Sequence, residues 1–399
     1  MTLQRPNGAS SNRAVFFALG LGSFAIGTAE FAAMTLVPMI AHALSITVPE
    51  AGHAIVAYAV GVCVGAPAIA LVSSRVSRKT MLIGMMLLYA VGNGLTAIVP
   101  GYYALLICRF VSGLPHGAYF GIAGLVASSR VPPNQRSQAV AKVVLGLTIA
   151  TIAGVPLASV IGQYLSWRWA FVLIATVALC TVLLVMVFLP KDAVRSEANI
   201  LDEINALRHR QVWLTLGIGA VGFGSVFCVY TYLASIMREV THAPVPATPV
   251  MFAIFGAGLT VGTLVCGWLA DRKMMPTIGG VLLVEATAMA GFSGASHHLY
   301  ELGFIVFMMG CGGGLATVVQ ARLLEVAVGA EGLAAALNQS AFNIANALGP
   351  YLGGLAIAAG LGWTSVGWVG FALAIGGFLI WLVSVAEEAK SRRVTPGGR

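Results

Sequence analysis

The sequence predicts an all-α membrane protein whose twelve transmembrane helices form two six-helix bundles related by a pseudo-two-fold axis. The first observation is composition, because 58% of the 399 residues are hydrophobic and only 9% are charged, against roughly 25% charged residues in a soluble domain. Too few polar side chains remain to cover a soluble fold of this length, so apolar side chains must face lipid. The other observations are the lengths of the apolar runs and a repeat between the two halves.

Twelve apolar runs are long enough to cross a membrane as helices, because about 20 residues rising 1.5 Å each span a hydrocarbon core of about 30 Å. Transmembrane β-strands would alternate in hydrophobicity over about ten residues, and these runs do not. The runs are 14–41, 50–72, 80–99, 102–126, 143–165 and 169–189 in the first half, and 213–237, 249–270, 277–296, 302–321, 333–359 and 364–386 in the second.

The longest segment between two runs divides the chain into halves. Apolar residues recur there at the spacing of an amphipathic helix: Ile200, Leu201, Ile204 and Leu207. This pattern predicts an interfacial helix. The expected organisation is an N-terminal six-helix bundle at 1–189, a cytoplasmic linker at 190–212 and a C-terminal six-helix bundle at 213–399.

The two halves carry the same landmarks at nearly constant distance. A basic turn follows the second run of each half, at 74–79 and 271–273. Glycine closely precedes proline in the fifth run of each half, as Gly154-Val155-Pro156 and as Gly349-Pro350. A parallel repeat of this kind predicts a cavity between the halves and transport by alternating access.

Positive charge predicts the topology, because short cytoplasmic loops retain lysine and arginine. With the N-terminus inside, Arg168 and Arg238 lie in outer loops, Arg109 lies within the fourth run, and every other basic residue is cytoplasmic. Both termini are therefore expected in the cytoplasm, with the first run retained as a helix and not cleaved as a signal peptide. The net charge of +8 follows from this topology and does not indicate a nucleic-acid partner.

Motifs for enzymes and cofactors are missing from the sequence. All six cysteines fall within the apolar runs, without a CxxC pair or a histidine at ligand spacing, so no metal or other cofactor is expected. A GxGxxG string at 217–222 lies inside a run, where a dinucleotide-binding strand and loop cannot form. With no GxxxxGK[ST], HExxH or GxSxG motif, neither an enzyme nor ATP-driven transport by this chain alone is expected.

Five motifs follow one another along the chain: Thr28-Ala29-Glu30-Phe31, the basic turn at 73–79, the fourth-run segment 109–117, Gly154-Val155-Pro156 and Trp167-Arg168-Trp169. From about residue 14 to 386 the chain thereby resembles the major facilitator superfamily. It is most similar to the twelve-span drug:proton antiporter group and to bacterial sugar-efflux and chloramphenicol-resistance-like exporters, the arabinose-efflux-type permeases. The resemblance implies a monomeric, multi-pass exporter of the bacterial inner membrane.

Ionisable residues inside the runs are functional candidates, because each costs several kcal/mol in lipid. Glu30 lies roughly 16 Å and Arg109 roughly 10 Å from the outer ends of their runs, and the long arginine side chain can span that difference in depth. Desolvation favours a neutral carboxyl and a guanidinium favours an ionised one, so water access would set the proton on Glu30. The resemblance assigns proton coupling to such a pair, and a purely structural pair is the alternative. For Glu285 no role is evident.

Five side chains are candidates for substrate binding: His116, Tyr230, Gln339, Asn343 and Asn346. His116 can bind substrate or relay protons, or it is a neutral histidine bonded to a backbone carbonyl. The three amides follow helical spacing on one face and suit a hydroxylated or amphiphilic substrate, with interhelical hydrogen bonding as the alternative. For Tyr230 a cavity wall and plain packing are both open. The glycine patterns around Gly61, Gly113 and Gly258 indicate helix packing.

The resemblance also implies a conformational latch at the basic turns. Its candidate residues, together with the proline of the fifth run, are Arg75, Arg78, Pro156, Asp271 and Arg272. Ser74 and Ser77 replace the acid and the glycine of the family's turn, so the second-half copy is nearer the pattern. Solvated charges of cytoplasmic loops explain the basic positions equally well.

The predicted function is secondary active transport that exports a small molecule, a sugar or drug-like compound, in exchange for protons. Its partners are the substrate, protons and the lipid bilayer. A proton-independent facilitator or an importer of sugar-like solutes is the alternative, and a receptor would bind ligand without flux. Sugars, amphenicol drugs, purine-like metabolites and lipophilic cations all remain open as substrates.

Overall fold

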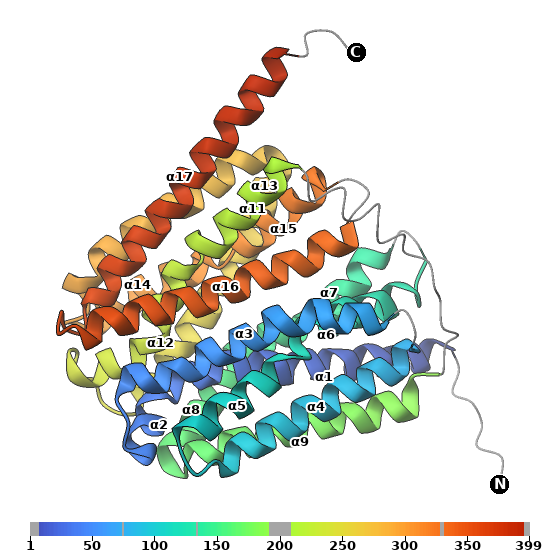
Figure 1. Cartoon of the computed structure of the whole chain (residues 1–399), viewed down its shortest axis with the longest axis horizontal. Coiled ribbons are helices and arrows are strands. Elements are labelled where there is room, and N and C mark those ends of the chain that lie inside the picture. Colours follow the sequence, from blue (N-terminus) through green and yellow to red (C-terminus); the bar gives the residue numbers. More distant parts are fainter. Residues whose placement is uncertain (1–7, 74–75, 133–134, 191–208, 328–330, 395–399) are drawn as a thin grey trace. The chain divides into compact units, whose positions relative to one another are not determined.

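The computed structural model describes residues 8–73, 76–132, 135–190, 209–327 and 331–394, and every regular element within them is a helix (Figure 1). The first half contains α1 (Gly8–Thr35), α2 (Val37–Leu44), α3 (Val48–Ser73), α4 (Arg78–Ile98), α5 (Tyr102–Gly113), α6 (His116–Ser128), α7 (Arg136–Ile149), the π-helix η2 (Ala150–Gly154), α8 (Val155–Tyr164) and α9 (Trp167–Phe188). The second half contains α11 (Arg210–Gly217), the π-helix η3 (Ile218–Gly222), α12 (Gly224–Glu239), α13 (Ala247–Ala295), α14 (Leu299–Gly312), α15 (Leu315–Val326), α16 (Glu331–Ala358) and α17 (Ser365–Val394).

Local sequence explains where several helices begin. Thr47 and Glu50 form a capping box at the start of α3, in which the Thr47 N–H donates to Glu50 Oε2 at 2.7 Å and the Glu50 N–H donates to Thr47 Oγ1 at 3.3 Å. Ser77 caps α4 by accepting a hydrogen bond from the N–H of Thr80 at 3.3 Å. The serine that replaces the family's glycine in this turn therefore serves as a helix cap.

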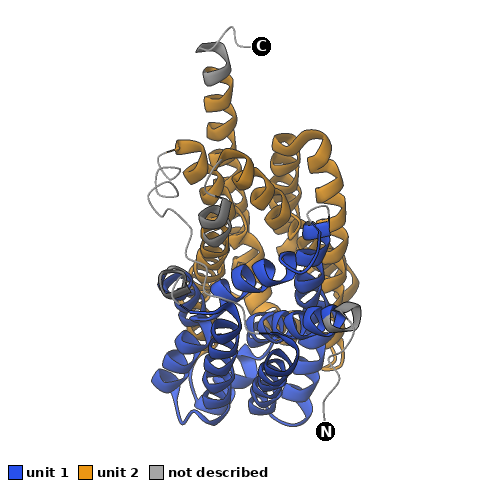
Figure 2. Cartoon of the chain, turned by 90° about the vertical axis from the view of Figure 1, so that its right-hand side faces the viewer, with its two compact units in different colours: residues 1–46, 57–198 blue, residues 47–56, 199–399 orange. Residues whose placement is uncertain are grey.

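The chain divides into two compact units, unit 1 with residues 1–46 and 57–198 and unit 2 with residues 47–56 and 199–399 (Figure 2). Within unit 1, α1 packs against α7 and α9, and α4 packs against α5 and α9 (Figure 1). Within unit 2, α13 packs against α14 and α17, and α12 packs against α16 and α17. The helices bury small, polar and aromatic side chains inside each unit, and many further large apolar side chains are exposed on the outside.

Ten helical stretches of the described residues are long and apolar enough to cross a membrane. The predicted runs 249–270 and 277–296 lie on either side of Lys273 within α13, a stretch of 49 residues that counts once among the ten. At Lys273 the backbone of α13 is not helical, with φ of −149° and ψ of 84°. The run 333–359 corresponds to α16, which is not among the ten. The interfacial helix expected at 200–207 lies outside the described residues.

Glycines bring pairs of helices into backbone contact, and the same contacts recur in both units. In unit 1 a Cβ added to Gly61 would meet the carbonyl oxygen of Phe110, and one added to Gly113 would meet that of Tyr58. The matching contacts of unit 2, each 197 residues further along, join Gly258 to Phe307 O and Gly310 to Phe255 O. The predicted packing role of these glycines is confirmed.

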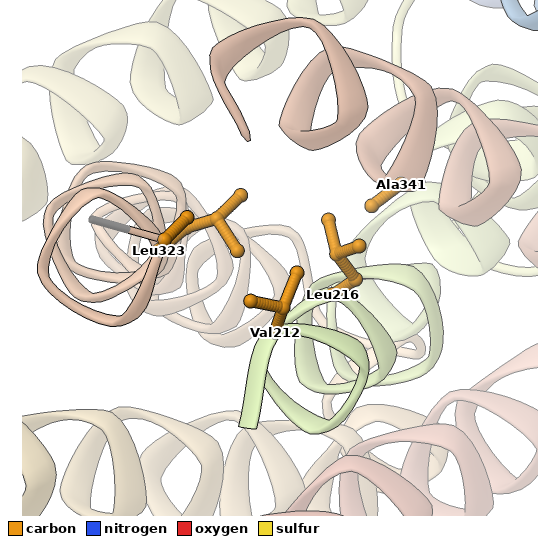
Figure 3. Packing of buried hydrophobic residues seen from close by; sticks show 5 residues of the cluster. Val212, Leu216, Leu323 and Ala341 are labelled. Atoms are coloured by element: carbon orange, nitrogen blue, oxygen red, sulfur yellow. The ribbon is translucent and has the colours of Figure 1, made fainter. Parts of the chain in front are cut away.

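An apolar cluster joins three helices of unit 2. Val212 and Leu216 of α11 point toward Leu323 of α15 and Ala341 of α16 (Figure 3). All four side chains are at least nine-tenths buried. The cluster holds the three helices together beside Arg210 and Arg322, whose ion pairs are described below.

Candidate functional site

Arg109 is buried in the core of unit 1, where its side chain is 1% exposed. From α5 its Nη1 donates to Asn93 Oδ1 at 3.4 Å and its Nη2 donates to the carbonyl oxygen of Ala29 at 3.3 Å. The guanidinium also lies over the Tyr58 ring, with its carbon 4.4 Å from the ring centroid, and 5.3 Å from the centroid of Phe171. One buried positive charge thus connects α1, α3, α4, α5 and α9.

A chain of hydrogen bonds runs beside the guanidinium. The Tyr58 hydroxyl lies 2.9 Å from His116 Nδ1 and 3.2 Å from the Tyr89 hydroxyl, and the Tyr89 hydroxyl lies 3.3 Å from the carbonyl oxygen of Ile26. His116, Tyr58 and Tyr89 are each at least 97% buried. The hydrogen-bond partner of the His116 ring is therefore the Tyr58 hydroxyl. The alternative drawn from the sequence, a neutral histidine with no part in transport, expected a backbone carbonyl there. Hydroxyl and imidazole groups can both accept and donate hydrogen bonds, so this row of hydrogen-bonded side chains can pass a proton from one group to the next.

Glu30 lies next to Ala29 on α1 and is 9% exposed. Its carboxyl interacts electrostatically with Arg109, Tyr58 and Tyr89. The structure therefore brings the two ionisable residues expected to form a pair into one group of side chains. We call this group the polar cluster, which consists of Glu30, Tyr58, Tyr89, Asn93, Arg109 and His116.

Sequence reasoning missed Tyr58, Tyr89 and Asn93. Tyr89 and Asn93 are four residues apart on α4, and the Asn93 side chain donates to the Tyr89 carbonyl at 2.8 Å. That i, i+4 spacing on an apolar helix was the available signal. It is weak, because hydroxyls and amides in transmembrane helices commonly serve packing alone.

Pro156 lies at a break in the fifth predicted run. The π-helix η2 ends at Gly154 and α8 begins at Val155, with Pro156 in its first turn. A Cβ at Gly154 would meet the Thr28 side chain and, at 3.1 Å, the Phe24 ring. The break is therefore in contact with α1 through Phe24 and Thr28, the latter two residues before Glu30.

The remaining substrate-binding candidates belong to unit 2 and so are not part of the polar cluster. Tyr230 is fully buried, with its ring 5.0 Å from that of Phe252 and 4.3 Å from that of Phe255. Asn343 and Asn346 are buried on α16, and Asn343 Nδ2 donates to the carbonyl oxygen of Gln339 at 2.9 Å. Asn343 Oδ1 finds no hydrogen-bond partner among the described residues. A buried free acceptor of this kind can receive a substrate hydroxyl.

The latch candidates that the structure describes, Arg78, Asp271 and Arg272, are exposed or only partly buried. Arg75 lies outside the described residues, and Arg78 is the half-buried first residue of α4. Asp271 and Arg272 are exposed just before the kink in α13, and the Arg272 guanidinium lies 3.4 Å from the centroid of the Trp268 ring. Within the described part of the chain Asp271 forms no ion pair.

The described ion pairs between different helices of unit 2 join α17 to α11 and to α15 instead. Arg322 of α15 is 8% exposed and pairs with Glu325 at 2.7 Å and with Glu388 of α17 at 3.0 Å. Arg210 of α11 pairs with Glu387. These acidic partners were not among the sequence candidates, since charges near a helix end are usually solvated.

Replacing Arg322 by methionine should lower the stability of unit 2 by about 2 kcal/mol, because two charge-assisted hydrogen bonds are lost from a buried site. The measurement is thermal unfolding of the purified protein in detergent. Arg210→Met is the matched control, since the Arg210 side chain is 73% exposed and exposed pairs contribute about 0–1 kcal/mol. Equal unfolding temperatures for the two variants would show that the Arg322 network is not structural.

The described residues contain no group of three or more His, Cys, Asp or Glu side chains placed to hold a metal ion. Ionisable chemistry in the described core of unit 1 therefore centres on the polar cluster.

Comparison with known proteins places this geometry in context. Residues 19–331 match the description of the Major Facilitator Superfamily. The chain is 37% identical over 379 residues to the inner membrane transport protein YdhP of Escherichia coli K12, covering 94% of this chain and 96% of the relative. It is 34% identical to the putative transporter AraJ of the same strain, covering 88% of this chain and 90% of AraJ.

A more distant relative is the chloramphenicol resistance protein of Streptomyces lividans, at 30% identity over 84% of this chain and 86% of that protein. Among solved structures, a point mutant of the nucleoside transporter NupG matches with a TM-score of 0.77, covering 93% of this chain and 99% of that one. At 12% sequence identity this last likeness concerns the fold alone.

Proposed function

Because the chain belongs to the major facilitator superfamily, we propose that it is a proton-coupled exporter that moves a sugar or drug-like compound out of the cell by alternating access. The family consists of transporters, so the chain is a multi-pass inner-membrane transporter of a small molecule. Proton exchange, outward direction and substrate class are the parts we add. No catalytic step belongs to this proposal.

For the membrane layout we propose twelve spans in two six-helix bundles, 1–189 and 213–399, joined by a cytoplasmic linker at 190–212, with both termini in the cytoplasm and a monomer as the working unit. The two segments of α13 on either side of Lys273 and the helix α16 supply the spans beyond the ten apolar stretches. The recurrence of the glycine contacts at a distance of 197 residues supports a repeat of this kind.

The observation that carries the proposal is the buried guanidinium of Arg109 in contact with the residue before Glu30. In this structure two of the five N–H groups of Arg109 donate to Ala29 O and Asn93 Oδ1, and Nε has no hydrogen-bond partner among the described residues. When Glu30 loses its proton, the new negative charge attracts the guanidinium, which moves toward the carboxylate. Loading and unloading of one proton therefore changes the contacts between α1, α4 and α5, which couples the proton to helix movement.

Substrate contacts are assigned to His116 in unit 1 and to Tyr230, Gln339, Asn343 and Asn346 in unit 2. The free acceptor on Asn343 supports hydrogen bonding to a hydroxylated compound. Conformational roles are assigned to Arg75, Arg78, Pro156, Asp271 and Arg272. The names of two relatives support export: the chloramphenicol resistance protein, and a probable sugar efflux transporter of Mannheimia succiniciproducens that is 27% identical over 91% of this chain.

The test is substrate-driven proton movement in proteoliposomes that contain an internal pH dye, with arabinose, chloramphenicol and ethidium as probes. Wild-type protein should change the internal pH with at least one probe. Glu30→Gln, which holds the side chain neutral, should abolish that change while the probe still binds.

Glu301→Gln is the matched control, because Glu301 is an exposed acid in the first turn of α14 and its loss should leave proton movement intact. Probe flux without proton movement in wild type would contradict the antiport proposal. Facilitated diffusion through the same fold would then be the better account.

A further inference from the structure

A second carboxyl, Glu285, is buried in unit 2 and plays no part in the mechanism above. It belongs to the second segment of α13 and is 1% exposed. Its Oε2 lies 3.5 Å from the hydroxyl of Ser225 on α12, and its Oε1 has no hydrogen-bond partner among the described residues. An ionised carboxylate without a counter-charge is strongly disfavoured in such a place.

The hydroxyl of Ser225 lies within reach of both the Gly222 carbonyl and the Glu285 carboxyl. Ser225 Oγ lies 2.8 Å from the carbonyl oxygen of Gly222, which can only accept, and 3.5 Å from Glu285 Oε2. A serine hydroxyl has one proton to donate and two lone pairs to accept. If that proton is given to Gly222, the contact with Glu285 is a hydrogen bond only when the carboxyl is protonated and donates.

The surroundings of Glu285 supply no positive charge. On α14 the titratable side chain that interacts with it is Cys311, and α12 presents Ser225. Within the described residues no basic side chain interacts with the carboxyl. Among the described residues, therefore, no positive charge balances an ionised Glu285, and its own proton is what keeps it neutral.

Glu285 is also in contact with a helix break. A Cβ added to Gly312 would overlap Glu285 Oε1. Gly312 is the last residue of α14, and Gly313 and Gly314 separate it from α15. On the other side Ser225 lies one residue past the junction between the π-helix η3 and α12. The carboxyl thus lies between two irregular segments, the places where a helix most easily changes conformation and admits water.

The internal repeat places Glu285 beside the counterpart of the polar cluster. With the offset of 197 residues taken from the glycine contacts, Glu285 corresponds to Leu88, which precedes Tyr89, and Gly312 corresponds to Pro115, which precedes His116. The counterparts of Tyr58, Tyr89, Asn93 and Arg109 are the apolar residues Phe255, Ala286, Ala290 and Val306. Unit 2 thus has apolar residues at these four positions and carries one ionisable group, Glu285, directly before the counterpart of Tyr89.

We propose that Glu285 is a second proton-binding site of this transporter, separate from Glu30. In this conformation its carboxyl is protonated and donates to Ser225. The proton leaves to water, and a carboxylate remains, when the breaks at 222–224 and 312–314 rearrange. This inference deepens the proposed antiport function, but protonation of Glu285 in the resting protein stands without it.

Infrared difference spectroscopy of the protein in lipid vesicles tests the proton directly, using pH itself as the probe. Wild type should show the C=O stretching band of a neutral carboxyl that is missing in Glu285→Gln. Ser225→Ala, which removes the hydrogen-bond partner, should shift this band without abolishing it. The band should lose intensity in alkaline buffer. Its absence from wild type, or its persistence unchanged at every pH, would overturn the proposal.

The number of protons exchanged per transported molecule tests the role of Glu285 separately from the proposed antiport function. In proteoliposomes Glu285→Gln should lower the number of protons exchanged per molecule of chloramphenicol, or of whichever probe wild type transports, while Glu301→Gln leaves it unchanged. An unchanged proton count in Glu285→Gln would show that Glu285 does not take part in coupling. If wild type moves no protons with any probe, the antiport function fails, and the infrared titration still decides whether Glu285 binds a proton.

Discussion

Arg109→Lys is expected to reduce transport by roughly 10- to 100-fold while leaving the protein folded. Lysine keeps the positive charge but has a single nitrogen, which cannot reach both Asn93 Oδ1 and Ala29 O as the two Nη atoms of Arg109 do. Loss of one charge-assisted hydrogen bond, about 1.5–3 kcal/mol, corresponds to roughly 10- to 100-fold in rate. The lysine also stacks less well on the Tyr58 ring.

The measurement is the initial rate of proton movement in proteoliposomes at equal amounts of inserted protein. Arg168→Lys is the matched control, because Arg168, like Arg109, donates two hydrogen bonds. Its acceptors are the backbone carbonyls of Ala97 and Val99, both at 2.9 Å. Arg168 lies at the start of α9, outside the polar cluster. Transport by Arg109→Lys at the wild-type rate would show that only the charge of Arg109 is needed.

Gly113→Ala is expected to destabilise unit 1 by about 1–3 kcal/mol, the usual cost of adding a methyl group to a filled interior. A Cβ at this position would meet the carbonyl oxygen of Tyr58 and, at 3.0 Å, the backbone nitrogen of Val62. Backbone atoms cannot turn aside as a side chain can, so α3 and α5 must separate. Separation would also move Tyr58 away from Arg109, and transport should fall together with stability.

Thermal unfolding in detergent measures this effect, with Gly121→Ala as the control on the adjoining helix α6. A Cβ at Gly121 would have nothing within 4 Å, and alanine favours helix by about 1 kcal/mol over glycine. The control should therefore unfold at the same temperature as wild type or slightly above it. Equal destabilisation of both variants would show that the close contact at Gly113 does not limit stability.

The repeat makes the same prediction for unit 2, where Gly310 takes the place of Gly113. A Cβ at Gly310 would meet the carbonyl oxygen of Phe255 and, at 2.9 Å, the backbone nitrogen of Leu259. Gly310→Ala should lower the unfolding temperature as Gly113→Ala does. A much smaller effect would show that the two units tolerate separation of these helices differently.

Much of the candidate site was predictable because charge in lipid is costly. Glu30 and Arg109 stand out in apolar runs, and the structure places both in one cluster in unit 1. Tyr58, Tyr89 and Asn93 complete that cluster but were not predicted. Hydroxyls and amides are tolerated in transmembrane helices at small cost, so their presence in a run does not distinguish a site from packing.

Arg322 illustrates the opposite case. The sequence placed it only among the cytoplasmic basic residues, and the structure shows it to be a buried partner of two acids. Its position near the end of a run indicated a cytoplasmic charge, which says nothing of its partners. The structure buries it between Glu325 and Glu388, the latter 66 residues away along the chain. Partners at such a separation are decided by the packing of α15 against α11 and of α11 against α17, which no local pattern encodes.

The sequence by itself determined the class of the protein, the apolar runs, and the two ionisable residues inside the runs of the first half, Glu30 and Arg109. These follow from local composition, because every stretch of lipid-facing helix must be apolar and each exception is visible along the chain. Only the tertiary structure decided which polar residues meet: His116 with Tyr58, Arg109 with Asn93, and Glu285 with Ser225. These contacts depend on how closely the glycine faces let neighbouring helices approach, and that distance is a property of pairs of helices and not of any one segment.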